Sequence, residues 1–377
     1  MIIRQVRWIP YQVPLHTEFG TARGSTSLRE GLIVRLVTEE GIVGIGEVAP
    51  MPAFSGATIA DSLAFLQSCA PNLIGTAIEE LWDDAAGSEA GHSAANAAVR
   101  CGLNVAAGDA LGQLKGLPFA RLIVDQPAEV VPLNATVAVA NRDDAARLAR
   151  EAIESGFACV KVKVGMATSV EDEVNRIEHI RAAVGPKCRL RLDANGAWDV
   201  DQAIETINAL SRSNVDLVEQ PVEAGNLIGM AQVRKKVGVR IGADESVTGI
   251  DGARRVLECE AADVLIVKPM LVGGIVAGRR IVELAIEAGV GIIVTTSVDT
   301  GIGIAAALHL AATLPTPMEA CGLATGYFLA CELLRRSLPV LSGSMTVPNG
   351  FGLGVEIDND ALQAYRSTSF AAGYVPE

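Results

Sequence analysis

The sequence predicts an α/β protein in which a (β/α) barrel follows a smaller α+β unit. From about residue 130, short apolar segments with the pattern of buried strands recur at intervals of 24 to 30 residues, each followed by a helix-patterned stretch. The eight segments are VPLNATV, CVKVKVG, RLRLDANG, VDLVEQPV, VRIGADES, DVLIVKPM, GIIVTTSV and PMEACGL. Eight such units are what a closed barrel needs, and a doubly wound open sheet is the competing architecture.

The N-terminal part has a different pattern, with strands first and helices after them. IIRQVRWIPYQV and LREGLIVRLVTEEGIVGIGEVAP alternate as strands, with a tight turn at Glu40-Gly41. TIADSLAFLQSCAPNL, AIEELWDDAAG and HSAANAAVRCGLNVAAGDALGQLKG are predicted helices, the last of which ends at Gly116. The Gly-rich tail, with one short strand candidate, is too small to fold alone and is expected to return to the first domain. We therefore expect an α+β domain over 1–124, a barrel over 125–338 and a returning segment over 339–377.

Composition and charge restrict the class of protein. Of 377 residues, half are apolar and a fifth are charged, which suffices for a large core. Lys and Arg number 31 against 44 Asp and Glu, and this acidic balance without a basic patch argues against a nucleic-acid surface. The seven scattered cysteines fit reduced thiols, and no apolar run is long enough for a signal peptide or membrane span. We expect a soluble cytoplasmic protein with a small-molecule partner; the oligomeric state, a homo-oligomer included, is left open.

Five consecutive predicted strands end in ionisable side chains. Catalytic groups of a parallel barrel come from the carboxyl ends of its strands, which meet at one mouth. A single charge there is more often solvated or ion-paired, but five in register indicate a common centre. The charged side chains, with one amide among them, are Lys161, Lys163, Asp193, Asn195, Glu219, Asp244, Glu245 and Lys268.

The three carboxylates and three lysines of this set suggest a metal-assisted proton transfer. Carboxylates on three adjacent strands suit Mg²⁺, whereas zinc is disfavoured because none of the four histidines has ligand-like spacing at a strand end. A desolvated lysine near other positive charges can act as a base near neutral pH, and the metal would stabilise the resulting enediolate. A Schiff-base aldolase and a non-catalytic barrel that binds a carboxylate are the alternatives from other classes.

The motifs KVKVG, RLDANGAW, VEQPV, GADES and IVKPMLVGG, in this order and spacing, resemble the enolase superfamily, specifically its muconate-lactonizing-enzyme subgroup. The resemblance implies a modified TIM barrel of the (β/α)7β type beneath an N-terminal α+β capping domain. It also implies Mg²⁺, with Mn²⁺ as a substitute, on the three carboxylates Asp193, Glu219 and Asp244. Such enzymes use a Lys or His base with a metal ion.

The resemblance also implies roles for the remaining site residues. Lys163 and Lys268 would face the substrate from opposite sides, and Lys161 would support Lys163 and the substrate carboxylate. Asn195 and Glu245 would lie behind these groups. Specificity is expected from the capping loops His16–Ser27 and Ala49–Thr58 and from the last strands; the candidates are Phe19, Met51, Phe54 and Ser297.

Three reactions of the subgroup stay open. TTSVDTGIGIAAALHLAA and ACGLATG most resemble o-succinylbenzoate synthases of menaquinone or phylloquinone biosynthesis, which remove water from their substrate. N-succinylamino acid racemases share most of the pattern and are the alternative. Dipeptide epimerases usually have Asp-x-Asp at the eighth strand, where this sequence has Glu319-Ala320-Cys321, so a dipeptide substrate is disfavoured.

Two glycine-rich segments are weaker signals. GIVGIGEV opens no helix, which argues against a dinucleotide site. VGGIVAG follows a strand and could hold a phosphate, but we expect it only to close the barrel after Lys268.

Overall fold

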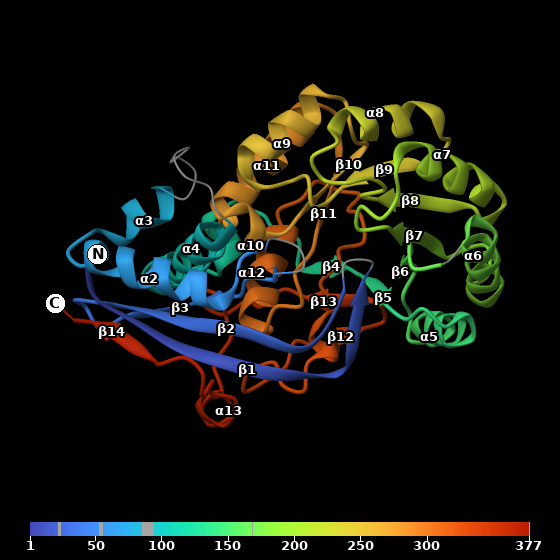
Figure 1. Cartoon of the computed structure of the whole chain (residues 1–377). Coiled ribbons are helices and arrows are strands. Elements are labelled where there is room, and N and C mark those ends of the chain that lie inside the picture. Colours follow the sequence, from blue (N-terminus) through green and yellow to red (C-terminus); the bar gives the residue numbers. More distant parts are fainter. Residues whose placement is uncertain (22–23, 53–55, 85–93, 168, 377) are drawn as a thin grey trace.

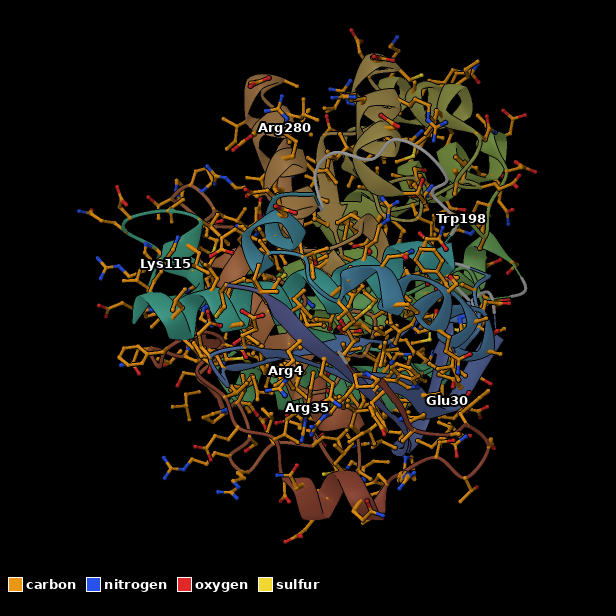
Figure 2. The ribbon with its side chains drawn as sticks, turned by 90° about the vertical axis from the view of Figure 1, so that its left-hand side faces the viewer. Arg4, Glu30, Arg35, Lys115, Trp198 and Arg280 are labelled. Carbon is orange, nitrogen blue, oxygen red and sulfur yellow. The ribbon has the colours of Figure 1, made fainter. Side chains whose placement is uncertain are left out.

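The computed structural model of the chain describes residues 1–21, 24–52, 56–84, 94–167 and 169–376. An antiparallel sheet with its own helices lies beside a barrel of parallel strands with helices around it (Figure 1). The predicted fold class, a barrel with an N-terminal capping domain, is therefore confirmed. Charged side chains such as Lys115 and Arg280 lie on the outside of the molecule (Figure 2). Among the described residues, no helix combines the length and the apolarity that crossing a bilayer requires.

Seven parallel strands form the barrel sheet in the order β5-β6-β7-β8-β9-β10-β11. They are β5 (Asn134–Val137), β6 (Cys159–Lys163), β7 (Arg189–Asp193), β8 (Val215–Glu219), β9 (Arg240–Ala243), β10 (Val264–Val267) and β11 (Gly291–Val294). Each coincides with a predicted strand. Because sequence neighbours are also neighbours in the sheet, the doubly wound order is excluded.

The eighth predicted strand, PMEACGL, is reduced to two residues that close the barrel. Cys321 makes a parallel bridge to Leu133 and Gly322 makes one to Thr295. The N–H of Cys321 donates to the carbonyl of Pro132 at 2.8 Å, so one residue of contact on each side satisfies the backbone. The short 3₁₀ helix η3 (Gly326–Phe328) follows in place of a barrel helix, which agrees with the (β/α)7β type.

The helices around the barrel begin where a polar side chain can accept hydrogen bonds from their first N–H groups. Asn141, Ser169, Asp199 and Asn226 cap four of them in this way. The helices are α5 (Arg142–Glu154), α6 (Val170–Val184), α7 (Val200–Ala209), α8 (Leu227–Lys236), α9 (Gly249–Glu258), α10 (Pro269–Val272), α11 (Ile275–Glu287) and α12 (Gly301–Ala311), with the 3₁₀ turn η2 (Leu210–Ser213).

The inside of the barrel is layered, because residues two apart along a strand share a face. Leu217, Ile266 and Ile293 belong to a small buried apolar cluster of their own. Leu217 precedes Glu219 by two residues and Ile266 precedes Lys268 by two. This apolar layer therefore lies beneath the charged mouth and separates it from the opposite end of the barrel.

The capping domain is an antiparallel sheet packed on helices. Its strands are β1 (Ile3–Thr21), β2 (Gly24–Thr38) and β3 (Val43–Val48), and its helices are α2 (Ile59–Leu73), α3 (Ile78–Asp84) and α4 (Ala94–Lys115), followed by η1 (Phe119–Leu122). Gly44 and Gly46 of GIVGIGEV let β3 approach α4 closely, since a Cβ at either would collide with the backbone carbonyl of Ala106 or Gly102. Gly116, with φ of 64°, follows α4 as predicted.

The loop predicted over His16–Ser27 is wrong. β1 and β2 continue as a long hairpin, in which Phe19 pairs with Thr26 and Gly20 pairs with Ser25. A register shift between Pro14 and Phe19 lets the pairing resume beyond the prolines. A polar, Gly-rich composition does not prevent backbone pairing, and the hairpin carries Phe19 onto Phe328, with ring centroids 5.1 Å apart.

The C-terminal tail contacts both parts of the molecule. It contains β12 (Val340–Leu341), β13 (Ser344–Thr346), α13 (Asn359–Ala364) and β14 (Gly373–Val375), where the sequence suggested one short strand. β13 pairs with β4 (Val130–Pro132), just before the barrel, and β14 pairs with β1 of the capping sheet.

Candidate active site

The charged residues predicted from the sequence lie together at the carboxyl ends of five neighbouring strands. Lys163, Asp193 and Glu219 are the last residues of β6, β7 and β8, and they are paired in register across the sheet. Asp244 and Lys268 directly follow β9 and β10. All five are at least 95% buried, so they face a shared interior rather than solvent.

The three carboxylates form a compact set. One carboxylate oxygen from each of Asp193, Glu219 and Asp244 lies within 4.8 Å of the others. Oδ1 of Asp244 is buried and accepts no hydrogen bond from any described residue. Three buried oxygen donors, one of them without a partner, fit the ligand preference of a hard divalent cation such as Mg²⁺.

Lysines approach this set from the two flanking strands. Nζ of Lys161 lies 2.8 Å from Oε1 of Glu219 and 3.0 Å from Oδ2 of Asp193. Nζ of Lys163 lies 2.5 Å from the same Asp193 oxygen, and Nζ of Lys268 lies 2.5 Å from Oδ2 of Asp244. The two candidate bases therefore stand at the two ends of the carboxylate set.

Burial and charge shift the pKa values in opposing directions. Burial alone would lower the pKa of Lys161, but the carboxylates of Asp193, Glu219 and Asp244 outweigh it and hold that pKa above its usual value. Lys268 has a raised pKa for the same reason, with Asp244 the main partner. Burial and the charge of Asp193 raise the pKa of Glu219 to about 8. The expectation of lysines surrounded mainly by positive charge does not hold here, because the carboxylates dominate their surroundings. A cation on the carboxylates would compete with the lysines for the same oxygens.

Polar side chains behind the charged set fix its orientation. Asn195 accepts a hydrogen bond from Lys163 at 3.0 Å and donates to Oε1 of Glu245 at 2.9 Å. Gln220, which we did not predict as a site residue, accepts from the N–H of Asp244 at 3.0 Å and from the N–H of Ser246 at 3.2 Å. Gln220 directly follows Glu219 in the VEQPV motif, and its φ of 41° turns the chain at the end of β8.

A cavity of about 30 Å³ opens over the lysines. Phe19 of the hairpin covers it, and its ring centroid lies 5.9 Å from Nζ of Lys163. The lining residues are Phe19, Thr136, Lys161, Lys163, Lys268, Thr295, Thr296, Ser297, Val298, Gly322, Thr325 and Phe328. Of the predicted specificity residues, Phe19 and Ser297 line the cavity. Met51 is buried in the hydrophobic core and does not line it, and Phe54 lies outside the described residues.

Glu319, at the place compared with the Asp-x-Asp of dipeptide epimerases, lies at the opposite end of the barrel. Its carboxylate pairs with Arg191 at 2.7 Å and Arg240 at 2.8 Å. Arg191 is two residues before Asp193 on β7 and therefore lies below the site. The residues around the eighth strand that line the cavity, Gly322 and Thr325, are uncharged.

The VGGIVAG segment has no free helix terminus for a phosphate. Oδ1 of Asn104, on α4, accepts hydrogen bonds from the N–H groups of Ile275 and Val276 at 2.9 and 3.3 Å. Gly274, with φ of 121°, permits this approach because a Cβ there would lie 2.7 Å from the Asn104 oxygen. The segment therefore joins the barrel to the capping domain.

Solved structures of related enzymes have this architecture. N-succinyl Arg/Lys racemase from Bacillus cereus superposes with a TM-score of 0.91 at 26% identity, over 100% of both chains. A dipeptide epimerase from Enterococcus faecalis, solved with Mg and the dipeptide L-Leu-L-Tyr, superposes with a TM-score of 0.87 at 29% identity, over 94% of this chain and all of the epimerase.

Sequence comparison places both parts of the chain in one family. The family model described as mandelate racemase / muconate lactonizing enzyme, N-terminal domain, matches residues 3–123, and the model described as enolase C-terminal domain-like matches 144–361. An o-succinylbenzoate synthase from Thermobifida fusca is 38% identical over 250 residues, 65% of this chain and 76% of that enzyme. With its carboxylates and lysines at the strand ends, the chain belongs to the enolase superfamily, in the muconate-lactonizing-enzyme subgroup.

Proposed function

We propose that this enzyme is an o-succinylbenzoate synthase of menaquinone or phylloquinone biosynthesis, with Mg²⁺ on Asp193, Glu219 and Asp244. The observation that carries the proposal is the placement of Lys163 and Lys268 at the two ends of a buried carboxylate set. A divalent cation bound there supplies electrostatic stabilisation for negative charge on the substrate carboxylate. Mn²⁺ offers similar oxygen coordination and would substitute for Mg²⁺.

The proposed roles of the lysines follow from their positions. Lys163, as the neutral amine, takes the proton from the carbon next to the substrate carboxylate. The resulting ammonium then gives that proton to the departing hydroxide, so water leaves and a carbon–carbon double bond forms. Lys268 stays protonated and faces the developing negative charge, while Lys161 holds Asp193 and Glu219 in place.

Racemisation of an N-succinylamino acid is the second candidate. It would use the same first step, but Lys268 would return a proton from the opposite face. The likeness to the Bacillus cereus N-succinyl Arg/Lys racemase over the full length favours this reading. Both candidates start from a carboxylate that also carries a succinyl group.

A dipeptide substrate has less support. A dipeptide has a free ammonium, which needs an anionic partner when it is buried. The cavity residues from the eighth strand, Gly322 and Thr325, offer none, and Glu319 is held by arginines at the other end of the barrel.

The alternatives from other classes are weaker still. A Schiff-base aldolase needs a neutral lysine and no carboxylate triad, whereas the raised pKa values of Lys161 and Lys268 favour their charged forms. A barrel that only binds a carboxylate would not need lysines on two sides of the site. A Lys163→Ala variant separates this case, because a binding protein would have no rate to lose.

The deciding experiment incubates the protein with Mg²⁺ in D₂O, once with the cyclohexadiene precursor of o-succinylbenzoate and once with N-succinyl amino acids. An aromatic product from the first supports the synthase, and α-deuterium in the second supports the racemase. The same mixtures with excess EDTA are the control. Turnover of neither substrate by the magnesium-loaded protein would overturn the proposal.

A further inference from the structure

The segment between β11 and α12 carries an unusual backbone at the cavity wall. Val298 has φ of 59°, in the left-handed region that β-branched residues avoid. It lines the cavity together with its neighbour Ser297. Such a conformation persists only where surrounding contacts hold it, so those contacts indicate what the segment is held for.

Arg29, from β2 of the capping domain, holds the segment at Val298. Its guanidinium is 98% buried and donates from Nε to the carbonyl of Val298 at 3.0 Å. It also donates to the carbonyls of Ala49 and Pro50, and Nη2 lies 3.4 Å from Oδ1 of Asp299. A planar guanidinium with several fixed donors thus ties one end of β3 to the barrel wall.

Glu47, from β3 of the capping domain, holds the other end of the segment. Its buried carboxylate accepts hydrogen bonds from the N–H of Thr300 at 3.0 Å, from the Thr300 hydroxyl at 2.8 Å and from the N–H of Gly303 at 2.8 Å. These groups belong to the start of α12, where unpaired N–H groups favour an anion. A Cβ at Gly303 would lie 2.8 Å from Oε2 of Glu47, so this approach requires glycine.

Ser297 is the group that this clamp presents to the cavity. Its side chain is 98% buried, and among the described residues its hydroxyl has no hydrogen-bond partner. A buried hydroxyl without a partner is unfavourable, which a substrate oxygen would correct. The same wall carries Lys268, so a bound carboxylate would reach both.

We propose that Arg29 and Glu47 are positioning residues, which hold Val298 in its left-handed conformation so that Ser297 donates a hydrogen bond to the succinyl group of the substrate. The inference rests on the proposed function, since it assigns the succinyl oxygen, remote from the reacting carbon, to Ser297. The capping domain then contributes to specificity through the barrel wall as well as through its hairpin.

The test compares Ser297→Ala, Arg29→Lys and their combination, with whichever succinyl substrate the wild type turns over. Lysine keeps the charge beside Asp299 but lacks the fork that reaches Val298 and residues 49–50. Each single change is expected to raise KM about tenfold with kcat within about twofold, as for a lost hydrogen bond to a charged group. The double variant is expected to be no worse than either single one, because both act on one contact.

Two further variants separate positioning from general destabilisation. In the Arg29→Lys background, Val298→Gly is expected to restore KM, since glycine adopts a positive φ without help, whereas Val298→Ala is not. Arg181→Lys is the matched control. Arg181 also donates to backbone carbonyls, those of Ser213 and Gly185 among them, but next to the opposite end of β7, so its KM should stay unchanged.

Hydrogen–deuterium exchange supplies a readout that does not need turnover. Arg29→Lys is expected to speed exchange over residues 297–304, and Arg181→Lys is not. Unchanged exchange there, an unchanged KM in Ser297→Ala, or single effects that multiply in full would each overturn the inference. Wild-type protein that turns over neither substrate would instead show that the proposed function is wrong, and the exchange data would then decide on the clamp alone.

Discussion

Nζ of Lys268 lies 2.5 Å from Oδ2 of Asp244, one strand away in the barrel sheet. The other oxygen of the same carboxylate has no hydrogen-bond partner among the described residues. Asp244 thus connects a candidate base on one side with an open coordination position on the other. Lys163 and Asp193 form a similar pair at the far end of the set, at 2.5 Å.

Replacing Lys268 by arginine should separate the two candidate reactions. Arginine stays charged and cannot give up its proton in a protein, so it can face negative charge but not exchange protons with the substrate. We expect Lys268→Arg to keep dehydration within about tenfold and to lose racemisation by at least about 100-fold. Lys236→Arg, at the exposed end of α8, is the control for the substitution itself. Formation of aromatic product and α-deuterium exchange are measured side by side; retention of both reactions would contradict the assignment.

Removing the metal should abolish activity and lower thermal stability. A cation that binds only the native state raises the free energy of unfolding by about 2.7 kcal/mol at 100 times its Kd. We expect Mg²⁺ to raise Tm in wild type and not in Asp244→Asn, which loses a charged ligand. Asp251→Asn, on the exposed first turn of α9, should behave like wild type. An equal Tm increase in both variants would mean that Mg²⁺ binds elsewhere.

The charged site was predictable because each of its residues directly follows or ends an apolar strand. Asp193, Glu219 and Asp244 needed only the strand spacing and the rule that parallel strands share one mouth. Gln220 was missed, although it lies in a quoted motif, because its function depends on φ of 41° and on contacts with the next strand. Sequence patterns report burial and periodicity, but not which backbone N–H a side chain will reach.

The clamp around Val298 could not be predicted for a related reason. Arg29 and Val298 are 269 residues apart, and nothing local to either residue indicates the other. The hairpin at Phe19 was also misjudged, since its polar composition concealed backbone pairing that the neighbouring strand provides. Both errors concern the capping domain, where contacts between distant segments decide the structure and local propensity has little influence.

His309 should make the protein less stable in acid. Its ring is fully buried in α12; Nδ1 accepts from the N–H of Ala120 at 3.3 Å and Nε2 lies 3.1 Å from the carbonyl of Leu353. Burial lowers its pKa from 6.5 to about 4. The folded state thus binds the proton less readily than the unfolded chain, so stability is lost as pH falls from about 6.5 to 4, by up to roughly 3 kcal/mol.

A comparison with His309→Gln isolates this effect. Burial raises the pKa of Asp109 to about 6, which favours the folded state as pH falls through the same range and masks part of the loss. We therefore expect the difference in free energy of unfolding between wild type and His309→Gln to shrink from pH 7 to pH 4. Urea unfolding at each pH measures it, and a difference independent of pH would contradict the assigned cause.

Gly46→Ala should destabilise the capping domain without touching the site chemistry. A Cβ at Gly46 would collide with the backbone carbonyl of Gly102 on α4, and a backbone group cannot move aside as a flexible side chain can. We expect a loss of about 1–3 kcal/mol in the free energy of unfolding, measured with urea. Gly238→Ala is the matched control, because nothing lies within 4 Å of a Cβ there. Equal effects of the two substitutions would mean that glycine at position 46 is not required for β3 to pack on α4.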